Sequence, residues 1–150
     1  MKYKKVITGL VVLAIGLGAW YYVGSEINRK SPSMVNIDED FETSSIKILN
    51  EYDTDQPKAD KKYLGKIILL YGNIKSIETD EKGFHTMVLG DSTSMSSVRC
   101  SMDNIIAINK ASLPVGAEVV LKGECTGFNS DEMGLGADLV LNRCVIINKL

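Results

Sequence analysis

Residues 66–102 read KIILLYGNIKSIETDEKGFHTMVLGDSTSMSSVRCSM, and this stretch decides the fold. Residues 66–77 are rich in β-formers, residues 84–89 alternate between apolar and polar side chains, and residues 96–102 read as a further strand. Polar turns separate the three segments. We therefore predict three consecutive strands. The first should be bent or bulged near Gly72, because glycine weakens a regular strand.

The residues that follow complete a barrel-like order of elements. Residues 103–110 have helical spacing, residues 117–125 alternate strictly, and residues 138–147 form a last apolar strand. A loop of a dozen residues, 126–137, joins the last two strands. Three strands, a helix and two more strands are the order of the five-stranded OB-type barrel, whose helix lies between strands 3 and 4. The predicted fold class is therefore mainly β.

The segment before the barrel, residues 38–62, is predicted to be a leading amphipathic helix. Three acids at 38–40 mark its start, because carboxylates favour the positive end of the helix dipole. Pro57 interrupts or ends the helix, and a second short turn at 59–63 fits the pattern. The apolar stripe of the helix comprises Phe41, Ile48, Leu49 and Tyr52. The barrel domain then covers residues 63–150.

The N-terminal stretch has the properties of a membrane anchor. Residues 6–23 read VITGLVVLAIGLGAWYYV and contain no charge. As a helix, this run rises about 27 Å, near the thickness of the hydrocarbon core of a membrane. Residues 1–5 carry three lysines, which favours a cytoplasmic N-terminus and export of the rest of the chain. We predict a single-pass transmembrane signal-anchor at 6–23, followed by a linker at 24–37.

A cleaved signal peptide is the alternative for the same stretch. Residues 23–25 and 16–18 offer weak cleavage sites with small residues, although neither has the preferred pattern. Cleavage would release a secreted or periplasmic protein. No cysteine follows the apolar run, so the sequence speaks against a lipoprotein anchor.

The composition limits the classes of function. The chain has 150 residues, of which 45% are hydrophobic and 24% charged, and this size excludes an enzyme with separate cofactor and substrate domains. The first 25 residues hold three lysines and no acid, which leaves 14 basic and 19 acidic side chains in the remainder. The predicted exported part is therefore acidic, with a net charge of −5.

The sequence contains no constellation of catalytic or metal-binding residues. Three dispersed cysteines and His85 lack the spacing of a metal site. The serine-rich run at 92–97 has no partner base for nucleophilic catalysis. The glycines at 134–136 do not open a helix as a phosphate-binding loop would. We therefore expect neither enzymatic activity nor a metal or other cofactor.

Several strand segments carry a resemblance to a known family. They are Lys62–Lys66, Val98–Cys100, Val115–Gly116 before Val119, Lys122–Gly127 and Asp138–Ile146. In this order and spacing, the chain resembles the tRNA_anti-like family of small exported bacterial OB-fold proteins. The resemblance implies an OB barrel in a bacterial membrane or envelope, and it implies no reaction.

Three cysteines in an exported domain suggest one disulfide and one odd thiol. The leading hypothesis pairs Cys125 with Cys144, in a register that also pairs Gly127 with Asn142. Cys100 is then a free thiol that points inward. A bridge between Cys100 and Cys144, and three free thiols, are the alternatives.

OB barrels bind ligands on their second and third strands and on the flanking loops. By this analogy the predicted site comprises loops 78–83 and 126–137 and the side chains of Phe84, Met87, Arg99 and Phe128. The loops carry more acids than bases, which opposes binding of a nucleic-acid polyanion. We predict a non-enzymatic binding or accessory module with a protein, peptide or glycan ligand. Single-stranded nucleic-acid binding, or thiol-redox chemistry at Cys100, is the alternative.

Overall fold

The computed structural model describes three long ranges and three single positions near the N-terminus: residues 33–103, 113–130 and 136–149, with Gly18, Trp20 and Tyr22. The chain divides into two compact units, Met1–Pro32 and Ser33–Leu150. The predicted anchor at 6–23 lies outside the described residues except at the three single positions. The predicted helix at 103–110 lies outside them beyond Asp103. Within the described residues, no helix is long and apolar enough to cross a membrane.

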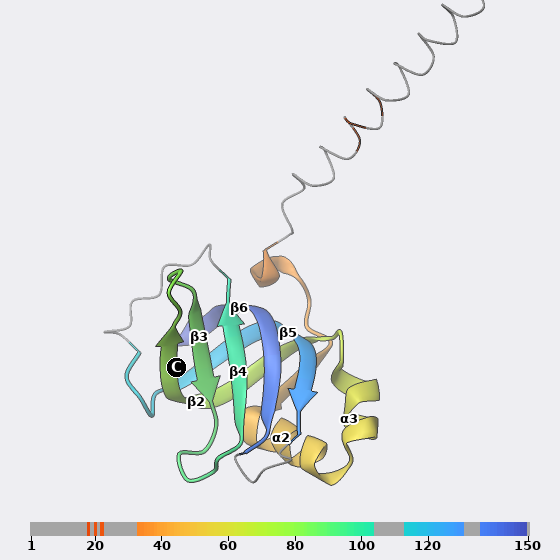
Figure 1. The fold of residues 1–150 in the computed structure, drawn as a ribbon. Helices are drawn as coiled ribbons and strands as arrows, with labels where there is room; N and C mark the ends of the chain where they lie inside the picture. Colours follow the sequence, from red (N-terminus) through yellow and green to blue (C-terminus); the bar gives the residue numbers. More distant parts are fainter. Residues whose placement is uncertain are drawn as a thin grey trace, which may run out of the picture. The chain divides into compact units, whose positions relative to one another are not determined.

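Strands β2 to β6 form the predicted five-stranded barrel (Figure 1). The sheet order is β1-β2-β3-β4-β6-β5, and β2 also pairs with β5, which closes the sheet on itself. β4 and β6 run parallel. The pairs β2–β3, β2–β5, β3–β4 and β5–β6 are antiparallel. The elements are η1 (Met34–Asn36), β1 (Phe41–Ser44), α2 (Ser45–Thr54), α3 (Gln56–Tyr63), β2 (Ile67–Thr79), β3 (His85–Leu89), β4 (Ser97–Met102), β5 (Glu118–Asn129) and β6 (Asp138–Lys149). The predicted five-stranded, mainly β architecture is confirmed.

The short strand β1 is an element that the sequence analysis missed. It extends the sheet parallel to the first half of β2. Asp40, directly before β1, is already hydrogen-bonded to the start of β2. Its N–H donates to the Ile67 carbonyl at 2.8 Å, and its carboxylate accepts from the Ile67 N–H at 2.9 Å. The prediction that residues 38–40 start a helix is therefore wrong, since Asp40 is bonded to the sheet instead.

The predicted helical segment begins later and is split in two. Ser44 caps α2 and Asp55 caps α3, each accepting a hydrogen bond from a backbone N–H in the first turn of its helix. Pro57 lies in the first turn of α3, where its missing N–H costs no helical hydrogen bond. The predicted interruption at Pro57 is confirmed.

Helix α2 covers one end of the barrel (Figure 1). Its buried residues, which join the core made by the inward side chains of the strands, are Ile48, Leu49 and Tyr52. Gly72 permits the close approach of the helix, because a Cβ at this position would lie 2.7 Å from the Ser45 hydroxyl oxygen. The predicted irregularity of β2 follows shortly after, between Ile74 and Ser76.

Residues 33–40, which we call the strap, lie over the outer side of β5 and β6. The strap includes η1, which contacts both strands. Met34 of η1 is fully buried, although it is not part of the barrel core. Lys122 of β5 donates a hydrogen bond to the Ile37 carbonyl at 3.0 Å and pairs with the Glu39 carboxylate at 2.8 Å. The strap thus gives a partner to an outward lysine that would otherwise face solvent.

Candidate ligand-binding surfaces

The outward side chains of β2, β3 and β4 form a surface that we call the open face. Strand pairing places Thr86 of β3 between Glu78 of β2 and Ser101 of β4. It also places Val88 opposite Arg99. Val88 is buried beneath its neighbours, while the other four side chains are at least partly exposed. This surface corresponds to the one predicted from the order of the strands.

Arg99 forms an ion pair with Glu78 across the intervening strand β3. Both side chains retain contact with solvent, with 34% of Arg99 and 50% of Glu78 exposed. Such an exposed pair contributes at most about 1 kcal/mol to stability, because water screens both charges. Arg99 therefore lies on the surface as predicted, with an acidic partner that the sequence analysis assigned to a loop.

Phe84 lies at the hairpin end of the open face and is 44% exposed. The Asp80 carboxylate holds the hairpin by accepting hydrogen bonds from the N–H groups of Lys82 at 2.9 Å and Phe84 at 2.8 Å. Gly83 completes the turn with a φ of 85°, a conformation that favours glycine. An exposed aromatic ring is thereby held beside the strands that carry Arg99 and Glu78.

Of the four predicted ligand-binding side chains, Met87 lies in the interior and Phe128 is partly buried against the core. Met87 is fully buried in the barrel core, because it shares the inward face of β3 with Leu89. The Phe128 ring stacks on Tyr52 of α2, with 4.5 Å between the ring centroids. Met87 is thus excluded from the ligand surface, and Phe128 packs the junction between α2 and β5.

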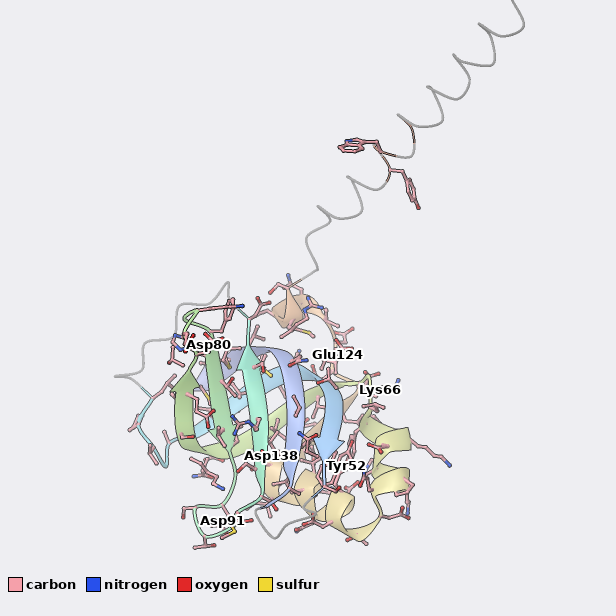
Figure 2. All side chains as sticks on the ribbon, viewed as in Figure 1. Tyr52, Lys66, Asp80, Asp91, Glu124 and Asp138 are labelled. Carbon is pink, nitrogen blue, oxygen red and sulfur yellow. The ribbon has the colours of Figure 1, made fainter. Side chains whose placement is uncertain are left out.

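The loop at the other end of the open face is tied to the barrel by one lysine. The Lys75 ammonium donates to the Ser94 carbonyl at 2.7 Å and to the Ser97 hydroxyl at 3.0 Å. Hydrogen bonds from Thr93 lower the pKa of the Asp91 carboxyl in the same loop. Figure 2 shows Asp80 and Asp91 at opposite ends of β3. Internal hydrogen bonds therefore hold the loops at both ends of this face.

The predicted loop 126–137 is partly strand. β5 continues to Asn129, and the Thr126 hydroxyl donates to the Val140 carbonyl of β6 at 3.2 Å. Residues 131–135, which include the acids of this predicted loop, lie outside the described residues. The described part of the loop therefore adds sheet rather than a separate ligand-binding loop.

The three cysteines are free and buried, so the predicted Cys125–Cys144 bridge is not formed. Cys125 lies opposite Leu141, and Gly127 lies opposite Val140 rather than Asn142. The cause is a set of three register shifts in the pairing of β5 with β6, which the sequence pattern does not show.

The environments of Cys125 and Cys144 oppose redox chemistry at these two thiols. Burial raises the pKa of the Cys125 thiol, which lies 3.7 Å from the Tyr52 hydroxyl. Burial, followed by a hydrogen bond with Cys100, raises the pKa of the Cys144 thiol well above its usual value. Both groups therefore stay protonated at neutral pH, and a thiol attacks disulfides as its thiolate. In the described part of the chain, no group of three or more His, Cys, Asp or Glu side chains could hold a metal ion.

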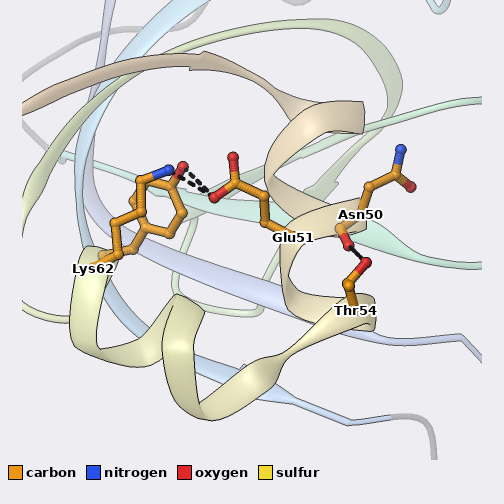
Figure 3. Close-up of polar contacts among 5 residues, drawn as sticks. Asn50, Glu51, Thr54 and Lys62 are labelled. Carbon is orange, nitrogen blue, oxygen red and sulfur yellow. Dashed lines mark hydrogen bonds and ion pairs between the residues drawn. The ribbon is translucent and has the colours of Figure 1, made fainter.

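A groove between α2 and α3 is a feature that the sequence analysis missed. Its volume is about 670 Å³, and its lining residues are Ser44, Ile46, Lys47, Asn50, Glu51, Thr54, Asp55, Lys58, Ala59 and Lys62. The Glu51 carboxylate accepts hydrogen bonds from the Lys62 ammonium at 2.7 Å and the Tyr63 hydroxyl at 3.0 Å (Figure 3). The hydrogen bond from Lys62 is the largest cause of a lowered Glu51 pKa. The sequence feature that could have indicated this groove is the presence of lysines at 47, 58 and 62 on both sides of the predicted helix break.

Comparison with family models supports the resemblance seen in the sequence. The model described as tRNA_anti-like matches residues 1–142. A comparison with curated proteins found no match.

A solved structure shares the fold at low sequence identity, and two others show weaker similarity. A proposed nucleic acid-binding lipoprotein from Klebsiella pneumoniae is 16% identical, with a TM-score of 0.53 over 71% of this chain and 91% of that chain. Asparaginyl-tRNA synthetase from Entamoeba histolytica is 13% identical, with a TM-score of 0.39 over 57% of this chain and 21% of the synthetase. An OBody bound to hen egg-white lysozyme is 15% identical, with a TM-score of 0.39 over 59% of this chain and 88% of the OBody.

Proposed function

Because the chain belongs to the tRNA_anti-like family, we propose that it is a non-enzymatic OB-fold binding or accessory module of a bacterial envelope. Residues 6–23 anchor it in the membrane, and the barrel lies on the extracytoplasmic side. The support for the anchor is the uncharged apolar run that follows three lysines. The support for binding is the open face, which is the surface that OB barrels commonly use.

The observation that carries the proposal is the exposed Phe84 ring at the hairpin end of the open face, whose strands also carry the Arg99–Glu78 pair. A flat ring can pack on a peptide backbone, an apolar side chain or a sugar, at a small entropic cost because it has few rotatable bonds. Arg99 and Glu78 can each exchange their mutual contact for one with a ligand, since an exposed ion pair is weak. The ligand class that suits such a mixed surface is a protein, peptide or glycan.

Affinity capture from native membranes tests this function. The full chain with a C-terminal tag is cross-linked in cells, and the captured partners are identified by mass spectrometry. We expect a reproducible partner whose recovery falls about tenfold in Phe84→Ala, as for an aromatic anchor of an interface. Val115→Ala is the matched control, because Val115 is also an exposed apolar residue and lies outside the open face. Equal recovery with Phe84→Ala and with Val115→Ala would remove the open face from the proposal.

A second candidate function, single-stranded nucleic-acid binding, is suggested by the description of the Klebsiella lipoprotein. The open face opposes it, because Glu78 balances Arg99 and Asp80 lies at the adjacent hairpin. Fluorescence anisotropy of the full chain with labelled single-stranded DNA and RNA distinguishes the two functions. We expect no change at low salt. A change that disappears as salt is raised, and is lost in Arg99→Ala, would favour the nucleic-acid function.

The anchor is tested separately from the ligand. The full chain should stay in the membrane fraction after alkaline carbonate extraction, and a C-terminal alkaline phosphatase fusion should be active. Deletion of residues 6–23 should abolish both results. An N-terminal sequence that begins near residue 25 in the mature protein would instead establish cleavage and overturn the anchor.

A further inference from the structure

The groove between α2 and α3 contains two acids that are already engaged by the protein. Glu51 is held by Lys62 and Tyr63, and Figure 3 shows its side chain directed from α2 toward Lys62 on α3. The Asp55 carboxylate accepts the Lys58 N–H at 3.1 Å and caps α3. Both carboxylates therefore make contacts within the protein, and both keep their negative charge.

The ammonium groups of Lys47 and Lys58 are the less engaged charges of the groove, although the charge of Lys47 contributes to the lowered pKa of the Glu51 carboxyl. Neither forms an ion pair with another residue in the described part of the chain. Lys62 is satisfied by Glu51, and it also lies 4.5 Å from the centroid of the Tyr63 ring. Three lysines and two acids line the groove, so its net charge is +1, on a domain whose total charge is negative. A local reversal of sign steers an acidic ligand to this place and repels it elsewhere.

The dimensions and the apolar content of the groove indicate the kind of acidic ligand. Along α2, the lining runs from Ile46 to Thr54, which corresponds to about 12 Å of helix and to about four residues of extended peptide. Ile46 is 54% exposed at one end, and Ala59 lines the opposite helix. The Asn50 side-chain amide can donate to and accept from a peptide backbone.

From these features we propose that the groove binds a short acidic peptide segment of a partner protein, with an apolar side chain against Ile46 and carboxylates at Lys47 and Lys58. The groove is built from α2 and α3, whereas the open face is built from β2, β3 and β4. The two proposals therefore succeed or fail independently, and a chain without an open-face ligand can still bind the acidic segment.

Fluorescence anisotropy with a labelled EDLED peptide tests the groove. The full chain is used in detergent, and a KDLKK peptide of opposite charge is the first control. Lys47→Glu and Lys58→Glu should each weaken binding of EDLED by about tenfold, the usual scale for reversing one charge at an interface. Lys61→Glu is the matched control, because Lys61 is an exposed lysine of α3 that does not line the groove. It makes the same change of net charge and should alter the affinity by less than about twofold.

Two outcomes would overturn the proposal. Equal weakening by Lys61→Glu would show that net charge alone attracts the peptide. Failure of EDLED to bind, combined with binding of the chain to vesicles of anionic phospholipid that is lost in Lys47→Glu, would assign the groove to lipid. Circular dichroism of each variant checks that α2 and α3 are retained, and an Ile46→Ala variant, which leaves the charges unchanged, should also weaken binding.

Discussion

The two outer sides of the barrel differ in what covers them. Over β5 and β6, the strap buries Met34 and pairs Lys122 with Glu39. On the open face of β2, β3 and β4, the corresponding ion pair of Arg99 and Glu78 faces solvent. Only 9% of the Lys122 side chain is exposed, against 34% of Arg99. The same kind of charge pair therefore occurs once with its lysine largely covered by the strap and once with both side chains open to solvent.

This difference separates a stabilising surface from a binding surface. Displacing the strap would expose the buried Met34 side chain and break the contacts of Lys122 with Ile37 and Glu39, so the strap is costly to displace. An exposed pair already shares its charges with water, so a ligand can replace one partner at little cost. The covered side thus serves the fold, and the open face is the side suited to recognition.

The largest expected effect on stability comes from removing the apolar contact of the strap. Met34→Ala leaves a cavity under the strap and should lower the free energy of unfolding by about 2–4 kcal/mol. Val35→Ala is the control, since Val35 is exposed in the same turn, and it should cost less than about 0.5 kcal/mol. Urea unfolding followed by circular dichroism measures both variants. Equal stability of the two variants would contradict the structural role of the strap.

A smaller effect is expected from the polar contact of the strap. Lys122→Met removes the hydrogen bond to the Ile37 carbonyl while keeping most of the apolar stem, and it should cost about 1 kcal/mol. Lys66→Met is the control, because Lys66 pairs with Asp40 at 3.6 Å with both side chains exposed. Chemical unfolding should rank Lys122→Met below Lys66→Met in stability. If Lys66→Met were the less stable variant, the contacts of Lys122 with the strap would not be the more stabilising ones.

The pH dependence of the strap sharpens the comparison further. The hydrogen bond from Lys122 is the largest cause of a Glu39 pKa below its ordinary 4.5. The stabilisation by Glu39 is therefore complete above this ordinary value, and it is lost as the pH falls through the lower pKa of the folded state. Glu39→Gln should destabilise the protein at neutral pH and much less under acid conditions. Unfolding curves at several pH values test this, and a difference that persists unchanged in acid would contradict it.

The smallest effect is expected on the open face. Glu78→Gln and Arg99→Gln should each change the free energy of unfolding by less than about 0.5 kcal/mol, because both side chains are exposed. A double-mutant cycle of the two sites should give a coupling energy below about 1 kcal/mol. A larger coupling would mean that this pair is part of the fold, as Lys122 and Glu39 are.

The strands could be predicted because each one is encoded by its own neighbours in the sequence. Alternation and turn residues placed β3 to within one residue, and Pro57 marked the break between α2 and α3. Met87 was misplaced because Val88 and Leu89 are also apolar, so alternation alone does not tell which side of β3 is buried. The stack of Phe128 on Tyr52 joins residues that are far apart in the sequence, and no local pattern predicts it.

The sequence by itself determined that the chain forms a small, mainly β barrel with an acidic surface and an apolar N-terminal run, because these properties follow from composition and local periodicity. The tertiary structure decided the parallel strand β1, the strap and the register of β5 against β6. That register places Cys125 opposite Leu141 and leaves the three thiols unbridged. The physical reason is that register and covering depend on the sum of many long-range contacts, and a shift of one residue changes which side chains meet without changing the local pattern.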